Sequence, residues 1–230
     1  MDIKMEGDGL WRMHLVMGGE DEVELIEPAV KGTLNVLNAC LEAKVKRVVV
    51  LSSVSAVFMN ADWPKGQVKD ESCWSVPECI ETTKNQWEAF EFGKKTELEI
   101  VTVCPSVILG SILQPTMNAS SWVLAKVLQG GFESFGYNYW TLVDVRDVAE
   151  AVLLVYKNSE GGERYVCTAQ TIGIKDLVDN YLRIAYPNYN YPHNLTHAEE
   201  EEEKLNSDKL QRLVWNYRPL EDTFIDSIES

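Results

Sequence analysis

The stretch Lys46-Arg47-Val48-Val49-Val50-Leu51-Ser52 decides the fold class of this chain. It is short, nearly continuously apolar and rich in valine, which is the pattern of a parallel β-strand that is covered on both faces. Residues 99–104 repeat this pattern and end at Pro105, and residues 164–167 form a further short strand. The sequence therefore predicts a parallel sheet.

Around these strands, apolar residues recur at helical spacing. The clearest helix is predicted for residues 23–43, where apolar residues from Ile26 to Leu41 return every three or four positions. Further helices are predicted at residues 86–95, 122–129, 145–157 and 174–185, an extended segment at 141–144, and a long polar loop at 58–83. This alternation of strands and helices indicates an α/β fold with a doubly wound parallel sheet.

Composition and charge narrow the class of protein. The 230 residues are 45% hydrophobic and 25% charged, as in ordinary soluble globular proteins. The formal net charge is −15 and the basic residues form no run, which argues against nucleic acid or an anionic membrane surface as the main partner. No segment has the apolar length of a membrane span, and residues 1–24 carry acidic residues where a secretory signal has its apolar region. We therefore expect a cytoplasmic protein.

The five cysteines are scattered and form no Cys-x-x-Cys pair, which indicates reduced and mostly buried thiols. Cys73 and Cys79 are close enough in sequence to suggest a disulfide or a metal site. None of the three histidines is spaced with them as a zinc ligand would be. We expect no bound metal.

Several strings of residues occur in an order that resembles one known family. These strings are Leu25–Leu37, Val48–Val57, Asp70–Trp74, Cys104–Gly110, Leu113–Thr116 and Val143–Ala149. Together they closely resemble plant cinnamoyl-CoA reductases and dihydroflavonol reductases, which belong to the extended short-chain dehydrogenase/reductase superfamily. The resemblance covers residues 22–230. It implies a Rossmann-type NAD(P)-binding domain, a smaller C-terminal substrate domain, and NADPH-dependent reduction of a phenylpropanoid or flavonoid carbonyl.

The resemblance also predicts that the Rossmann domain of this chain is incomplete. Residues 1–22 read as a divergent leader, residues 23–157 as the remnant of the Rossmann domain with interleaved substrate segments, and residues 158–230 as mainly the substrate domain. The family places a glycine-rich phosphate-binding turn near its N-terminus, and Gly7, Gly9, Gly18 and Gly19 do not follow that spacing. We therefore expect an N-terminally truncated sheet, an exposed sheet edge beside residues 48–51, and weak binding of NADP.

The resemblance also assigns the candidate site residues. Ser53 matches the family's catalytic serine, whose hydroxyl hydrogen-bonds the substrate carbonyl oxygen. Ser52, Pro105 and Ser106 match the segments that line the nicotinamide end of the cofactor. Taken without the family, Ser53 reads more simply as a serine that caps the turn after a strand.

One part of the reductase site is absent from the sequence. The family's proton donor is a tyrosine that is followed four residues later by a lysine, and none of the nine tyrosines here has a lysine at that position. The family pattern indicates a deletion of the segment directly after Asn85. Three interpretations remain open: a reductase relative with little or no catalysis, a non-catalytic partner or regulator of intact reductases, and residual activity that depends on Ser53 and a substitute acid.

Overall fold

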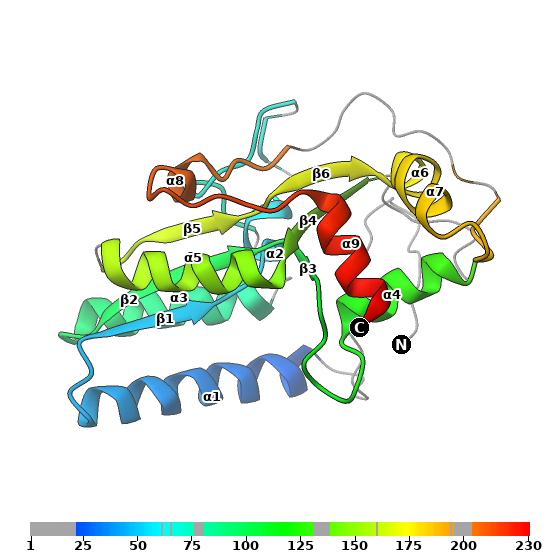
Figure 1. Cartoon of the computed structure of the whole chain (residues 1–230). Coiled ribbons are helices and arrows are strands. Elements are labelled where there is room, and N and C mark those ends of the chain that lie inside the picture. The colour runs from blue at the N-terminus through cyan, green and yellow to red at the C-terminus, as the bar shows by residue number, and fades with distance from the viewer. Residues whose placement is uncertain are drawn as a thin grey trace.

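The computed structural model describes residues 22–60, 62–64, 66–75, 81–130, 139–159, 161–193, 195 and 204–230. These residues form a mixed α/β structure with a parallel sheet, as the sequence predicts (Figure 1). The proposed leader, except for Glu22, lies outside the described residues, and so do Cys79 and the four N-terminal glycines. None of the helices that the structure describes combines the length and hydropathy needed to cross a membrane.

The first sheet contains the three strands that the valine-rich runs predict. Its strands are β1 (Arg47–Leu51), β2 (Glu99–Pro105) and β5 (Arg164–Cys167), all parallel and in the order β1-β2-β5. The central strand β2 is buried from Ile100 onward because it has a neighbour on both sides. Among the described residues β1 pairs only with β2, so it is an edge strand, and Leu51 at its end is 55% exposed.

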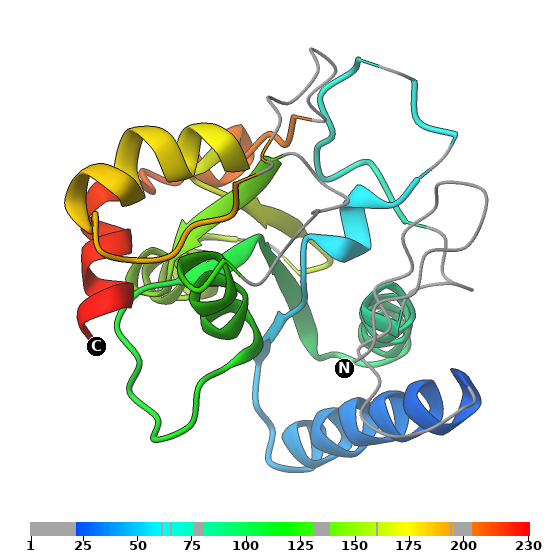
Figure 2. The same cartoon turned by 90° about the vertical axis from the view of Figure 1, so that its right-hand side faces the viewer.

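Helices cover both faces of this sheet, as expected for a doubly wound fold. Helix α5 (Val145–Asn158) packs its buried face on one side, where Val155 and Val101 belong to one buried cluster and Val49 packs against it. On the other side lie α1 (Glu22–Glu42) and α3 (Glu81–Lys95). Their apolar residues form a second cluster with the residues of β1 and β2 that point to this face. Figure 2 shows α1 and α3 on one side of the strands and α5 on the other.

A second, smaller sheet continues from the first. It consists of β3 (Val107–Leu109), β4 (Tyr139–Asp144) and β6 (Gln170–Gly173), with β3 parallel and β6 antiparallel to β4. Only Ser106 separates β2 from β3, and only Thr168 and Ala169 separate β5 from β6. Two strands therefore pass from one sheet to the other within one or two residues, at the carboxyl end of the first sheet.

The remaining helices are α2 (Ser55–Phe58), α4 (Ala119–Leu128), α6 (Ile174–Leu177), the π-helix η1 (Val178–Leu182), α7 (Arg183–Ala185), α8 (Asp208–Gln211) and α9 (Leu220–Glu229). Of these, α4, α6 and α9 pack on the second sheet, η1 and α7 continue α6, and the short helices α2 and α8 contact strands β2 and β5 of the first sheet. Leu142 of β4, Leu177 of α6 and Phe224 of α9 belong to one buried cluster that forms this second core.

Three sequence predictions need correction. The helix predicted at residues 86–95 begins at Glu81, so the polar loop ends earlier than expected, because its first turn is polar and Lys84 is exposed. Helix α4 begins at Ala119, three residues before the prediction, because the Asn118 side chain accepts a hydrogen bond from the Ser121 amide at 2.8 Å. The single helix predicted at residues 174–185 is divided by the π-helix η1. Strand β5 joins the first sheet, and the division at residue 157 stays a prediction.

Candidate functional site

The three parallel strands of the first sheet end at one edge, and a hydroxyl residue follows each of them. Ser52 follows β1, Ser106 follows β2 and Thr168 follows β5. The Ser52 amide donates to the Val103 carbonyl at 2.8 Å, and the Ser106 amide donates to the Cys167 carbonyl at 3.0 Å, so neighbouring strands remain paired up to these residues. We call Ser52, Ser106 and Thr168 the hydroxyl edge.

The hydroxyl edge carries unsatisfied hydrogen-bonding capacity. The side-chain oxygens of all three residues are buried and have no hydrogen-bond partner of normal geometry among the described residues, although the weakly bonding Cys104 thiol lies beside Ser52. A buried polar group without a partner costs about 1–3 kcal/mol, so such groups are uncommon in native proteins. In an open α/β sheet, ligands bind at the carboxyl ends of the strands. The clustering of these oxygens there indicates a ligand site.

Ser53 lies next to this edge in a well-defined turn. Its hydroxyl accepts a hydrogen bond from the Ser55 amide at 3.2 Å, as the turn-capping interpretation expects. The Val54 amide donates to the Pro105 carbonyl at 2.8 Å, which places Ser53 beside the end of β2. Because a serine hydroxyl has a proton to donate as well as lone pairs, the capping bond leaves Ser53 able to donate to a carbonyl oxygen. The structure thus brings Ser52, Ser53, Pro105 and Ser106 together, and their roles stay predictions.

Arg164 supports this turn through buried contacts. No functional or structural role was predicted for it from the sequence. Its side chain is buried, and its guanidinium donates to the carbonyl oxygens of Ala56 at 3.1 Å and of Glu71 and Cys73 at 3.2 Å each. It also stacks on the ring of Trp74, 3.5 Å from the ring centroid. These contacts tie α2 to the segment 66–75.

Other contacts reinforce the same connection. The Ser75 hydroxyl donates to the Ser55 carbonyl at 2.6 Å and accepts from the Met59 amide at 2.8 Å. The Lys69 ammonium donates to the Phe58 carbonyl at 2.5 Å. The turn that carries Ser53 is therefore fixed by hydrogen bonds on both of its sides.

The buried thiols beneath the turn are not nucleophiles. Burial raises the pKa of both Cys73 and Cys104, and this outweighs the opposing positive charge of Arg164. Both groups are therefore neutral thiols near pH 7, and a neutral thiol is a poor nucleophile and a poor metal ligand. No cluster of three or more His, Cys, Asp or Glu side chains suited to a metal ion is found in the part of the chain that the structure describes.

Helix α3 contains Asn85, the residue after which the family pattern places the missing tyrosine. It directs Gln86 inward, where the side-chain amide donates to Thr102 and, at 3.3 Å, to the Cys104 sulfur. The Gln86 Oε1 and Asn85 Oδ1 atoms are buried without a partner among the described residues. An amide is neither an acid nor a base near pH 7, so this part of α3 cannot replace the tyrosine.

Known proteins agree with this architecture. A family model described as the NAD dependent epimerase/dehydratase family matches residues 17–168. Cinnamoyl-CoA reductase 1 of Petunia hybrida is 33% identical over 92% of this chain and 67% of its own length, and cinnamoyl-CoA reductase 2 of Medicago truncatula is 34% identical over 90% and 65%. The crystal structure of vestitone reductase from alfalfa superimposes with a TM-score of 0.76 at 28% identity, over 91% of this chain and 72% of that one.

The chain belongs to the NAD dependent epimerase/dehydratase family. Within it, the relatives above confirm the predicted similarity to cinnamoyl-CoA reductase and dihydroflavonol reductase-like extended short-chain dehydrogenase/reductases. The chain spans about two thirds of the length of the curated relatives that it matches, 67% and 65% for the two named above.

Proposed function

We propose that this chain holds a carbonyl substrate and the nicotinamide end of NADP beside the hydroxyl edge, and that it reduces the substrate slowly or not at all. The proposal rests on the contrast between a serine that is held in position and a proton donor that is missing. The turn that presents Ser53 is hydrogen-bonded in place, whereas no tyrosine anywhere in the 230 residues is followed four positions later by lysine.

The hydroxyl edge supports a bound dinucleotide. Its buried, unpartnered oxygens could bond the amide and hydroxyl groups of a nicotinamide nucleoside, and Ser52, Pro105 and Ser106 are the residues that would hold that end. When bound, NADPH supplies the hydride for carbonyl reduction. By resemblance to the plant reductases, we propose a phenylpropanoid or flavonoid carbonyl compound as the substrate.

The chain's own residues explain the expected low rate. The Ser53 hydroxyl can donate a hydrogen bond to the substrate oxygen, but the alkoxide that forms after hydride transfer also needs a proton. On α3 the side chains of Asn85 and Gln86 are amides, which do not release protons near neutral pH. Loss of a general acid costs a factor of about 10² to 10⁴ in rate.

A binding experiment and a turnover experiment together test the proposal. Titration with NADPH, followed by nucleotide fluorescence, should give weak but saturable binding. Oxidation of NADPH with a hydroxycinnamoyl thioester should be at least about 10² times slower than with a full-length relative assayed in parallel. Turnover equal to that of the relative would overturn the catalytic part of the proposal, and the absence of any saturable binding would overturn the cofactor part.

A second candidate function is that of a non-catalytic partner or regulator of intact reductases. The observation that favours it is the edge strand β1, which among the described residues has no neighbour beyond it. An unpaired strand edge can accept a strand from another chain. A tagged form of the chain should then retain a full-length relative during purification, and failure to do so at micromolar concentrations would count against this function.

We also propose that the protein acts in the cytoplasm. Cys40, Cys73, Cys104 and Cys167 are all free thiols, which supports a reducing compartment.

A further inference from the structure

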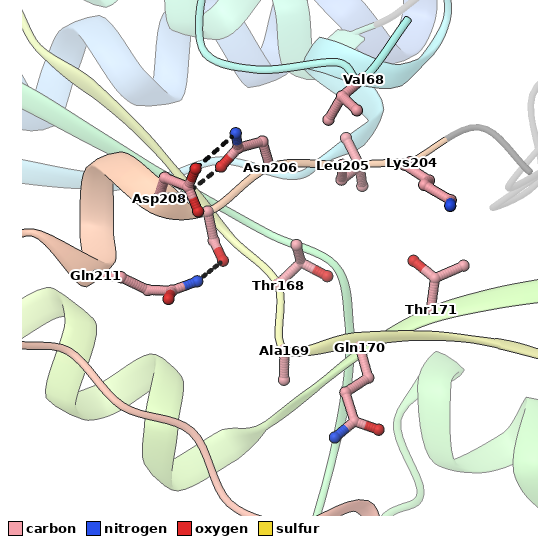
Figure 3. A pocket seen from close by; sticks show the side chains of 11 residues that line it. Val68, Thr168, Ala169, Gln170, Thr171, Lys204, Leu205, Asn206, Asp208 and Gln211 are labelled. Carbon is pink, nitrogen blue, oxygen red and sulfur yellow. Dashed lines mark hydrogen bonds between the residues drawn. The ribbon is translucent and has the colours of Figure 1, made fainter. Parts of the chain in front are cut away.

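A cavity of about 300 Å³ opens beside Thr168, the last member of the hydroxyl edge (Figure 3). One side is the segment Thr168–Thr171 after β5, and another is the segment Lys204–Asp208 before and at the start of α8. Ser52, Ser53, Pro105 and Ser106 do not line it, so the cavity adjoins the candidate reductase site and shares only Thr168 with the hydroxyl edge. Its volume is at the lower end of the range for small-molecule sites.

One end of the cavity offers hydrogen-bond donors and a positive charge. Thr168 is only 4% exposed and its hydroxyl has no hydrogen-bond partner among the described residues. Figure 3 shows the hydroxyls of Thr168 and Thr171 and the ammonium group of Lys204 around the same space. Two hydroxyl donors and one ammonium form a suitable donor set for a carboxylate.

The remainder of the lining divides into an apolar wall and a polar far end. Val68 and Leu205 lie together on one side of the cavity and contribute apolar surface. Asp208 lies at the end away from Lys204, and its carboxylate accepts a hydrogen bond from the Asn206 amide at 3.0 Å. The negative charge of Asp208 is therefore partly satisfied and separated from the donor end.

We propose that this cavity binds a small monocarboxylate with an apolar body. The carboxylate would lie between Lys204, Thr168 and Thr171, and the apolar body would pack against Val68 and Leu205. The bound oxygens would supply the buried Thr168 hydroxyl with the partner that it lacks. The site shares Thr168 with the hydroxyl edge but needs neither cofactor nor general acid, so carboxylate binding can be measured separately from the proposed reduction.

Benzoate is a suitable probe because it combines one carboxylate with a small apolar ring. Nuclear magnetic resonance titration of the whole chain should show saturable shifts at the amides of residues 168–171 and 204–206, and much weaker shifts with benzyl alcohol, which has the ring without the charge. Inorganic phosphate, an anion without an apolar body, should bind more weakly than benzoate.

Two variants and one control locate the site. Lys204→Met should weaken benzoate binding about fivefold, as expected for loss of an exposed ion pair. Thr168→Val, which keeps the shape and removes the hydroxyl, should also weaken it about fivefold. Lys157→Met removes the same charge from an exposed position that does not line the cavity and should change nothing.

Three results would overturn the proposal. Equal affinity for benzoate and benzyl alcohol would show that the cavity does not recognise the carboxylate. Equal affinity for phosphate and benzoate would show that it does not recognise the apolar ring. Unchanged binding by Lys204→Met would place the ligand elsewhere. This last variant keeps the test decisive even if Thr168→Val fails to fold, because Lys204 is exposed.

Discussion

At the scale of single residues, Ser53 is the most direct test of the catalytic proposal. A serine that hydrogen-bonds the substrate oxygen raises the rate only when a hydride donor and an acid are already positioned. We therefore predict that Ser53→Ala changes the residual rate of NADPH oxidation by less than about threefold, whereas the equivalent change in a full-length relative removes most of its activity. A large loss in this chain would instead reveal a substitute acid.

Asp144, at the end of β4, gives a prediction about stability and pH. Burial acts to raise its pKa, but hydrogen bonds from Arg146 and from the Thr223 hydroxyl outweigh burial, so the pKa is lowered. A lowered pKa means that this group contributes stability above the unfolded-state pKa and loses the contribution as pH falls through the folded-state pKa. The Arg146 guanidinium also lies 2.7 Å from Asp226 of α9.

We predict that Arg146→Met lowers the free energy of unfolding by about 2 kcal/mol at pH 7, because it leaves the buried Asp144 charge without its strongest partner. The loss should persist down to the ordinary pKa of an aspartate and shrink only as pH falls further, through the lowered pKa of Asp144. Urea denaturation at several pH values measures it. Arg183→Met removes a more exposed pair with Asp179 and should cost under about 1 kcal/mol at any pH. Equal losses for the two variants would contradict the prediction.

At the scale of elements, Arg164 connects β5 to α2 and to the segment 66–75. Replacing it with methionine keeps most of the buried volume but leaves the carbonyl oxygens of Ala56, Glu71 and Cys73 without their donor. We predict faster hydrogen exchange in residues 55–58 and 66–75 and a loss of about 2–4 kcal/mol in the free energy of unfolding. Arg212→Met, at an exposed position, should leave both unchanged. Unaltered exchange in Arg164→Met would show that Ser75 and Lys69 suffice to hold α2.

The elements that could be predicted are those whose own residues carry a strong signal. Strand β1 carries a run of three valines, β2 and β5 are short and buried, and α5 has a clear apolar face, so their bounds follow from sequence to within two residues. Strand β3 has three residues, and β6 contains one large apolar residue, Ile172, so neither has a detectable period. Their conformation depends on pairing with β4, which lies far away in the sequence.

The candidate site divides in the same way. Ser52 and Ser106 were predicted from the family resemblance, and each lies at the end of a predicted strand. Thr168 has the same position after residues 164–167, but the resemblance did not assign it. Arg164 could not be selected, because its importance comes from contacts with carbonyl oxygens about ninety to one hundred residues away. A buried arginine without a carboxylate partner leaves no pattern in the sequence.

At the scale of the whole molecule, the edge of β1 that pairs with no described strand has consequences for association. Leu51 is 55% exposed at the end of this strand, and Leu153 and Tyr156 on the neighbouring helix α5 are also more than half exposed. Arg47 of β1 donates to the Tyr156 carbonyl at 2.6 Å, which places the end of α5 beside the start of β1. Unprotected edges and apolar patches favour association.

We predict that the isolated chain is oligomeric or binds a dye that reports exposed apolar surface, and that Leu51→Lys shifts it toward a monomer that binds less dye. Size-exclusion chromatography with dye fluorescence measures both. Leu113→Lys adds the same charge at a fully exposed residue in the loop after β3 and should have little effect. A monodisperse wild-type monomer that binds no dye and unfolds cooperatively would show that the edge is covered.

The short connections between the two sheets have a mechanical consequence. Since β2 runs into β3 through one residue and β5 into β6 through two, any rotation of one sheet against the other must bend the chain at Ser106 and at Thr168–Ala169. Two members of the hydroxyl edge, Ser106 and Thr168, therefore lie in the connections about which the sheets would turn. A ligand bound at these connections would limit how far the two sheets can turn, so the angle between the sheets would depend on the size of the ligand.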